Sequence, residues 1–222
     1  MKKYHKRIIR FLLVLIGVFM FTPNAFSVPL ISNGGFETGD LTNWNTTSNV
    51  IVEGKWWGVS PTEGNYQAVM SPFGFLDSDL WQQPYINPEL YTEVTISFDY
   101  NLKALDWTKW RERGNDYLAV TFNDTEILRV YLNDVFGQGA TELGWTTFSD
   151  TYPVSVLSGP LTFKFHLENW GEGDEFQKMV GYIDNVSIEG TPIPEPSTLL
   201  LLGSFLSGLV GMAGVRRNFS RR

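Results

Sequence analysis

Hydrophobic and polar residues alternate in short runs along residues 28–190. The clearest run extends from Val94 to Leu102, where every second residue is apolar and the residues between are Thr, Ser, Asp and Asn. Alternation of this kind buries one side of a β-strand and leaves the other side in water. The same pattern predicts further strands at residues 49–53, 66–70, 80–83, 118–122, 126–131, 145–148, 161–167 and 182–189.

Turn-forming residues separate these strands. Gly, Pro, Asn and Asp gather at Asn33–Gly35, Glu63–Asn65, Asn87–Pro88 and Ser158–Pro160, and such clusters mark turns between periodic segments. Helical periodicity is nearly absent from residues 28–190. About nine strands at this spacing predict an all-β domain, an antiparallel two-sheet jelly-roll sandwich.

The first 27 residues have a different pattern. Five Lys and Arg residues precede an apolar run at residues 11–21, and Ala25-Phe26-Ser27 follows as a small-x-small site. This order is typical of a secretory signal peptide with an N-terminal helix, and cleavage is expected after Ser27. An uncleaved N-terminal anchor is the alternative.

The last 31 residues, 192–222, also differ from the domain. A Pro-rich spacer at 192–197 precedes an uncharged stretch at 198–215, and a basic end at 216–222 follows. At about 1.5 Å per residue, a helix over that stretch spans about 27 Å, close to the thickness of a bilayer core. The arginines beyond it favour the cytoplasmic side. An ordinary transmembrane anchor is one interpretation of this order.

The same three-part order resembles the PEP-CTERM sorting tail of Gram-negative bacteria, with Pro194, Glu195 and Pro196 as its signature. That resemblance implies recognition and cleavage by an exosortase during export. It further implies that the protein is membrane-anchored only transiently and ends at the cell surface or in the extracellular matrix. On this interpretation the chain comprises a signal peptide (1–27), a sandwich domain (28–190) and a sorting tail (191–222).

Charge is distributed unevenly between the tails and the domain. Nine of the 17 Lys and Arg lie in the tails, where Glu195 is the only acid among 24, so the region between carries 8 basic and 23 acidic residues, a formal −15. Nucleic acid and anionic lipid repel such a domain. The excess of acidic residues is compatible with binding of divalent cations or neutral polymers. Alternatively, it serves only to keep the domain soluble. Cysteine is absent, which excludes disulfides and thiolate chemistry.

Asp184 has an unusual place in the pattern of its strand. Strict alternation puts it on one face with Tyr182, Val186 and Ile188, which are apolar. A carboxylate on an inward face must be paired, hydrogen-bonded or bound to a metal. Glu37 raises the same question, because it directly follows Phe36.

Two motifs carry a second resemblance. Residues 33–44, which begin Asn-Gly-Gly-Phe-Glu and end in Trp44, and residues 182–188, Tyr-Ile-Asp-Asn-Val-Ser-Ile, resemble the opening and closing strands of galactose-binding-like jelly rolls, among them carbohydrate-binding modules. In those modules the positions matching Glu37 and Asp184 help to bind a structural Ca²⁺, and loop carbonyls complete the site. Here those carbonyls would come from Gly64 to Tyr66. Hydrogen bonds from both carboxylates to backbone amides are the alternative.

Aromatic residues make up 15% of the chain and include eight Trp. Flat rings stack on sugar rings, and polar groups beside them bind hydroxyls. Trp44 is expected in the core because of its motif. The candidate ligand-binding residues lie in segments of loop composition: Trp56, Trp57, Trp107, Trp110, Arg111 and Trp170. Packing of loops onto the sheets, or a salt-bridged loop around Arg111, is the alternative.

No catalytic constellation is found in the sequence. His5 lies in the signal peptide and His166 on the polar side of a strand, so a Ser triad or a zinc site has no partners of the familiar kind. We therefore expect a non-catalytic exported protein that binds carbohydrate or acts in the extracellular polysaccharide matrix. Its expected partners are exosortase, the secretion machinery and polysaccharide. The alternative is a structural or adhesive surface protein with no free-sugar ligand.

Overall fold

The computed structural model divides the chain into two units. One unit is Ser27–Pro192, and the other combines Met1–Phe26 with Ile193–Arg222. The structure describes residues 27–47, 49–72, 77–104, 116–123, 125–132, 134, 141–156, 159–169, 179–193 and 203. The predicted signal helix, the sorting motif Pro194–Pro196 and, apart from Gly203, the predicted transmembrane helix lie outside these residues. Within the described ranges, no helix is long and apolar enough to cross a membrane.

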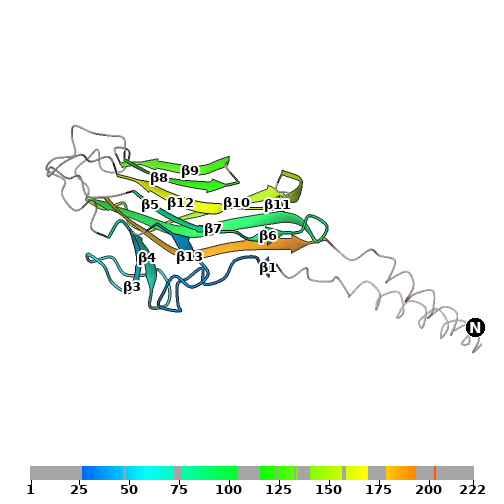
Figure 1. Ribbon diagram of the computed structural model, residues 1–222, viewed down its shortest axis with the longest axis horizontal. Coiled ribbons are helices and arrows are strands. Elements are labelled where there is room, and N and C mark those ends of the chain that lie inside the picture. The colour runs from blue at the N-terminus through cyan, green and yellow to red at the C-terminus, as the bar shows by residue number, and fades with distance from the viewer. Residues whose placement is uncertain are drawn as a thin grey trace, which may run out of the picture. The chain divides into compact units, whose positions relative to one another are not determined.

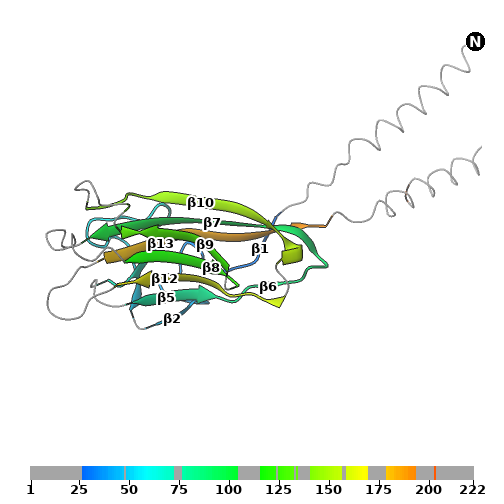
Figure 2. The same ribbon diagram turned by 90° about the horizontal axis from the view of Figure 1, so that it is seen from above.

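The described unit consists of two antiparallel layers of strands (Figures 1 and 2). The first sheet has the order β10-β7-β13-β4-β3, and β1 pairs with β13. Its strands are β1 (Val28–Pro29), β3 (Val50–Glu53), β4 (Gln67–Met70), β7 (Tyr91–Ala104), β10 (Thr146–Pro153) and β13 (Met179–Pro192). The last strand of the domain therefore lies in the middle of this sheet.

The second sheet has the order β2-β5-β12-β8-β9. Its strands are β2 (Asn45–Thr46), β5 (Ser78–Gln82), β8 (Tyr117–Phe122), β9 (Thr125–Tyr131) and β12 (Phe163–Glu168). A separate pair, β6 (Tyr85–Ile86) and β11 (Gly159–Pro160), and a 3₁₀ turn at Val154–Val156 complete the described elements. The predicted all-β two-sheet sandwich is confirmed, and each predicted strand has a counterpart.

The core lies between the two sheets and is rich in phenylalanine. Phe98 of β7 meets Phe165 of β12 edge-on, with ring centroids 5.0 Å apart, and stacks on Phe148 of β10 at 4.9 Å. Trp44 is buried and stacks on Phe36 at 5.4 Å, as the opening motif predicted. Full burial of each such side chain contributes about 1.5–3 kcal/mol, so these contacts hold the layers together.

A β-bulge interrupts β13 where it pairs with β7. The register shifts between Asp184 and Ser187, and Asn185 adopts a positive φ of 48°. Val186 and Ile188 face the core between the sheets, whereas Tyr182 packs in a separate cluster on the other side of the sheet. The prediction that these residues share one face with Asp184 is therefore wrong, because the extra residue of a bulge reverses the alternation.

The outer side of the first sheet is covered by the segment from Gly54 to Tyr66. Trp56 packs with Val69 and Tyr182 there, and the Tyr182 hydroxyl donates to the Trp56 carbonyl at 3.3 Å. Lys103 of β7 donates to the Trp57 carbonyl at 2.8 Å. These contacts fix the covering segment and bury the middle of β13 on both faces.

Candidate functional site

Glu37 and Asp184 both contact the covering segment. Oε1 of Glu37 accepts hydrogen bonds from the backbone amides of Asn65 and Tyr66, each at 2.9 Å. These two amides hold the pKa of Glu37 below its usual value. Gly64 lies against the same carboxylate with φ +59°, where an added Cβ would fall 2.3 Å from the Glu37 carboxyl carbon. A side chain at this position would displace the Glu37 carboxylate and strain the backbone, so glycine is favoured at this turn.

Asp184 is fully buried and binds the start of the same turn. Its Oδ2 accepts from the Thr62 amide at 2.8 Å, the Thr62 hydroxyl at 2.9 Å and the Glu63 amide at 3.3 Å. Oδ1 accepts from the amide of Asn185 at 2.8 Å. Burial raises the pKa of Asp184 despite these bonds, which act in the opposite direction. The two carboxylates thus clamp one turn against β13 and the first loop.

The donors around these carboxylates do not fit a calcium ion as the turn is folded. Ca²⁺ takes six to eight oxygen ligands, whereas the turn directs amide hydrogens of Asn65 and Tyr66 at Glu37 and those of Thr62 and Glu63 at Asp184. Among the described residues, no group of three or more acidic or histidine side chains is arranged so that it could hold a metal ion. These bonds are those of the alternative stated from the sequence, and calcium stays a prediction.

Trp56 and Trp57 are adjacent but have different environments. Both indole nitrogens donate to the carbonyl of Pro72 at 3.1 Å, and the rings meet edge-on at 6.3 Å. Trp56 is half-buried against the cluster beneath it, whereas 56% of Trp57 is exposed. Of the predicted binding residues that the structure describes, only Trp57 presents a large free surface. Trp107, Trp110, Arg111 and Trp170 lie outside the described residues.

The outer side of the second sheet carries a set of polar and aromatic side chains that lie far apart in the sequence and are brought together by strand pairing. In β12 the burial alternates, with Phe163, Phe165 and Leu167 inward and the residues between them half-exposed. The register places His166 beside Asp79 of β5 and Glu168 beside Tyr117 of β8, which pairs in turn with Tyr131 of β9. We name the surface made by the following residues the open face: Asp79, Trp81, Tyr117, Arg129, Tyr131, Lys164, His166 and Glu168.

His166 lies at the centre of a chain of charged groups on the open face. Its Nδ1 is 2.8 Å from Oδ1 of Asp79, and its Nε2 is 2.8 Å from Oε2 of Glu168. Lys164 Nζ lies 3.5 Å from the same oxygen of Asp79. The network therefore spans β5 and β12.

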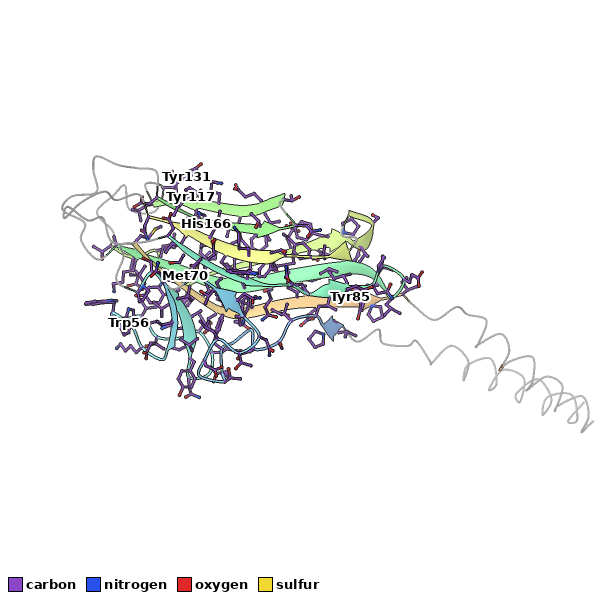
Figure 3. The ribbon with its side chains drawn as sticks, viewed as in Figure 1. Trp56, Met70, Tyr85, Tyr117, Tyr131 and His166 are labelled. Carbon is purple, nitrogen blue, oxygen red and sulfur yellow. The ribbon has the colours of Figure 1, made fainter. Side chains whose placement is uncertain are left out.

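Three rings continue the open face toward its β9 edge (Figure 3). Tyr117 lies 5.8 Å from the His166 ring and 5.9 Å from the ring of Tyr131. The guanidinium of Arg129 covers the Tyr117 ring at 3.9 Å and binds Glu126 through two nitrogens. That carboxylate raises the pKa of Arg129, and the guanidinium lowers the pKa of Glu126. Tyr131 remains 40% exposed.

Part of the open face was visible in the sequence. His166 was placed on the polar side of its strand, and extending the alternation of Leu118, Val120 and Phe122 back by one residue puts Tyr117 outward. The missing information was the pairing of β8 with β9, which brings Tyr131 beside Tyr117.

Comparisons with known proteins leave the family of this chain open. No family model matches it, and no curated protein matches it. The structure of TmCBM61 in complex with β-1,4-galactotriose is 17% identical over 73% of this chain and 98% of that one, with a TM-score of 0.49. A cyclase from Fischerella sp. in its apo form is 15% identical over 75% and 97%, with a TM-score of 0.48.

A third solved structure is similar at a lower level. The CBM22-1 xylan-binding domain of Xyn10C from Paenibacillus barcinonensis is 13% identical over 75% of this chain and 97% of that one, with a TM-score of 0.39. At these identities and TM-scores, the similarities decide neither the ligand nor the activity of this chain. Its function must be argued from its own residues.

Proposed function

We propose that this protein is a non-catalytic, exported carbohydrate-binding sandwich whose ligand lies on the open face. The observation that carries the proposal is the juxtaposition of Tyr117, Tyr131 and Trp81 with charged groups on an outer sheet surface. Aromatic rings supply apolar area for the faces of sugar rings, and carboxylates and guanidinium bind hydroxyls. Strands lie about 4.8 Å apart, so β5, β12, β8 and β9 spread these groups over roughly 14 Å.

The charge on the open face favours a neutral polymer as ligand. On the open face and at its β9 edge, each carboxylate already contacts a basic side chain: Asp79 contacts Lys164 and His166, Glu168 contacts His166, and Glu126 contacts Arg129. A hydroxyl can share these groups without separating the pairs, whereas an acidic chain would compete with the carboxylates. The strongly acidic domain adds to that repulsion.

Export and sorting form the second part of the proposal. Signal peptide 1–27 and the tail with Pro194, Glu195 and Pro196 would deliver the domain across the inner membrane, where an exosortase would cleave the tail. The predicted transmembrane stretch 198–215 would anchor the protein until that cleavage. The domain would then act at the cell surface or in the extracellular polysaccharide matrix.

The contacts among the charged side chains of the open face also support the alternative function, that of a structural or adhesive protein. Because Lys164, Asp79, His166 and Glu168 already bind one another, the surface needs no ligand to satisfy its polar groups. A structural or adhesive surface protein with no free-sugar ligand would have such a face. The two functions differ in whether isolated protein binds glycans.

A glycan array of neutral and acidic polysaccharides, probed with the full chain in a sugar-free detergent, tests the proposal. We expect binding to a neutral polymer and a loss of about tenfold in affinity, or 1.4 kcal/mol, for Tyr131→Ala, because the variant removes an exposed ring. Tyr85→Ala is the matched control, since it removes an exposed tyrosine outside the open face.

Two results would contradict the proposal, and a third would show that the variants are unsuitable. A silent array favours the structural alternative. Binding that survives Tyr131→Ala but is lost in Trp57→Ala moves the site to the covering segment. Equal loss in Tyr131→Ala and Tyr85→Ala indicates a general effect on folding, which circular dichroism of both variants checks.

A further inference from the structure

Exposed apolar side chains gather at one end of the sandwich. Tyr85 of β6 is 72% exposed, Leu90 in the turn before β7 is 55% exposed, and Val28 of β1 is 39% exposed. Figures 1 and 2 both place β1 and β6 at the end where β13 terminates, and Figure 3 places Tyr85 there. We call Val28, Tyr85 and Leu90 the exit end. Water-exposed side chains of this size in one place indicate a contact surface.

Both ends of the folded domain emerge at the exit end. Val28 pairs with Gly190, and Tyr91, the residue after Leu90, pairs with Pro192. Five residues, 193–197, separate Pro192 from the predicted membrane stretch at 198–215. At no more than about 3.6 Å per residue, those five residues reach at most about 18 Å. A bilayer spanned by 198–215 would therefore hold the exit end close to its headgroups.

From this placement we propose that the exit end rests on the lipid surface while the tail is anchored, with Tyr85 and Leu90 in the headgroup region. Tyrosine suits that region because its ring is apolar and its hydroxyl stays hydrated. The inference rests on the proposed membrane stretch and is independent of the proposed sugar ligand. It concerns the orientation of the anchored protein.

The charges near the exit end define the kind of lipid. Glu89, Glu93 and Glu189 lie in the turn before β7 and in the paired ends of β7 and β13. Anionic headgroups repel these carboxylates, and a zwitterionic surface does not. The contact is therefore apolar and favours phosphatidylcholine over a mixture with phosphatidylglycerol.

Spin labels on single cysteines test the inference in the full chain, which has no native cysteine. Leu90→Cys and Tyr85→Cys report on the exit end. Thr141→Cys is the control, because exposed Thr141 lies beside Ala104 at the opposite end of β7, about 43 Å along the strand. The labelled chains are reconstituted into phosphatidylcholine vesicles, with and without phosphatidylglycerol, and collected by flotation.

In the phosphatidylcholine vesicles, we expect the labels at 85 and 90 to collide severalfold less often with an aqueous nickel chelate than the label at 141, and more often with oxygen. Added phosphatidylglycerol should reduce this contrast. Equal nickel collisions at all three positions in floated vesicles overturn the inference and leave the membrane anchor standing. Collisions of both quenchers lowered at 85 and 90 indicate a protein contact instead, which also overturns it. Chains that fail to float refute the anchor and the inference together.

Discussion

At the residue scale, Asp184 and Tyr182 show how the covered side of β13 is stabilised. Both side chains are fully buried, and both bind backbone of the covering segment, Asp184 at Thr62 and Glu63 and Tyr182 at Trp56. A buried polar group is tolerated only when its hydrogen bonds are made. These two residues therefore hold the covering segment in one position on the sheet, because their hydrogen bonds are directional and apolar packing is not.

Asp184→Asn should lower the free energy of unfolding by about 1–3 kcal/mol, because one acceptor oxygen is replaced by a donor among amide hydrogens. Glu37→Gln, at an exposed position, should have a smaller effect in the same direction. Urea titration of both variants measures the difference. Equal stability of Asp184→Asn and the unsubstituted chain would contradict the clamp.

The same pair of residues allows a direct test for calcium. From the amide donors around Glu37 and Asp184, we expect the melting temperature to be the same in millimolar Ca²⁺ and in chelator. A fall in melting temperature with chelator, abolished in Asp184→Asn, would instead establish the calcium site that the resemblance implies.

Tyr182 gives the domain a sensitivity to alkaline pH. Burial, and next the charge of Glu142, raise its pKa above the usual value near 10; burial and Asp150 likewise raise the pKa of Tyr152 to about 12. Between pH 10 and the raised pKa of each tyrosine, the unfolded chain releases a proton that the folded chain keeps. The stability that is present below pH 10 is therefore lost as the pH rises through this range. In this range the free energy of unfolding falls by about 1.4 kcal/mol per pH unit for each such tyrosine.

Tyr182→Phe should therefore lose stability less steeply above pH 10. At pH 7 the free energy of unfolding of the variant should be lower by about 0.5–1.5 kcal/mol, because the variant lacks the hydrogen bond to the Trp56 carbonyl. Thermal melts from pH 7 to 11 provide the comparison, and parallel curves for the two proteins would exclude this role.

At the element scale, the bulge in β13 determines which residues face the turn. Asn185 occupies the left-handed region, with φ 48°, and its Nδ2 lies 3.4 Å from Oδ2 of Asp99. After the bulge, the Val186 amide donates to the carbonyl of Gly34 at 3.0 Å. Before the bulge, β13 thus binds the covering segment through Asp184. After the bulge, the same strand binds the first loop through the amide of Val186.

Substitution of Asn185 tests the importance of that conformation. Asn185→Val should destabilise the domain by about 1–2 kcal/mol, because a β-branched residue is strained at positive φ. Asn185→Gly is the control, since glycine adopts this conformation freely. The urea midpoint at constant slope reports the effect, and similar midpoints for Val and Gly would contradict it.

The bulge also marks the limit of prediction from the sequence. Strands such as Val94–Leu102 were predictable, because their alternation is set by burial of one side. The strand Tyr182–Glu189 was found for the same reason, but its strict alternation put Asp184 on the wrong face. Asn185 tolerates the left-handed conformation better than most residues, but this alone does not predict a bulge, since the extra residue is determined by pairing with β7.

At the scale of the whole molecule, the two outer surfaces of the sandwich differ in kind. One is covered by Gly54–Tyr66, which buries Tyr182 and Asp184, and the other is the open face. The two-layer class followed from periodicity, but the location of the open face depends on strand order. Tyr117 and Tyr131 become neighbours only because β8 pairs with β9, and a list of aromatic residues does not contain that pairing.

The position of β13 has a consequence for the biogenesis of the protein. The ribosome makes this central strand last, yet it pairs with β7, β4 and β1. On the proposed export route, the first sheet would lack the strand that joins its two halves until residue 192 had left the translocation channel, so the domain could not complete its fold from the N-terminus onward. The chain would then stay unfolded enough to be translocated, and the fold would close as the proposed C-terminal anchor reached the membrane.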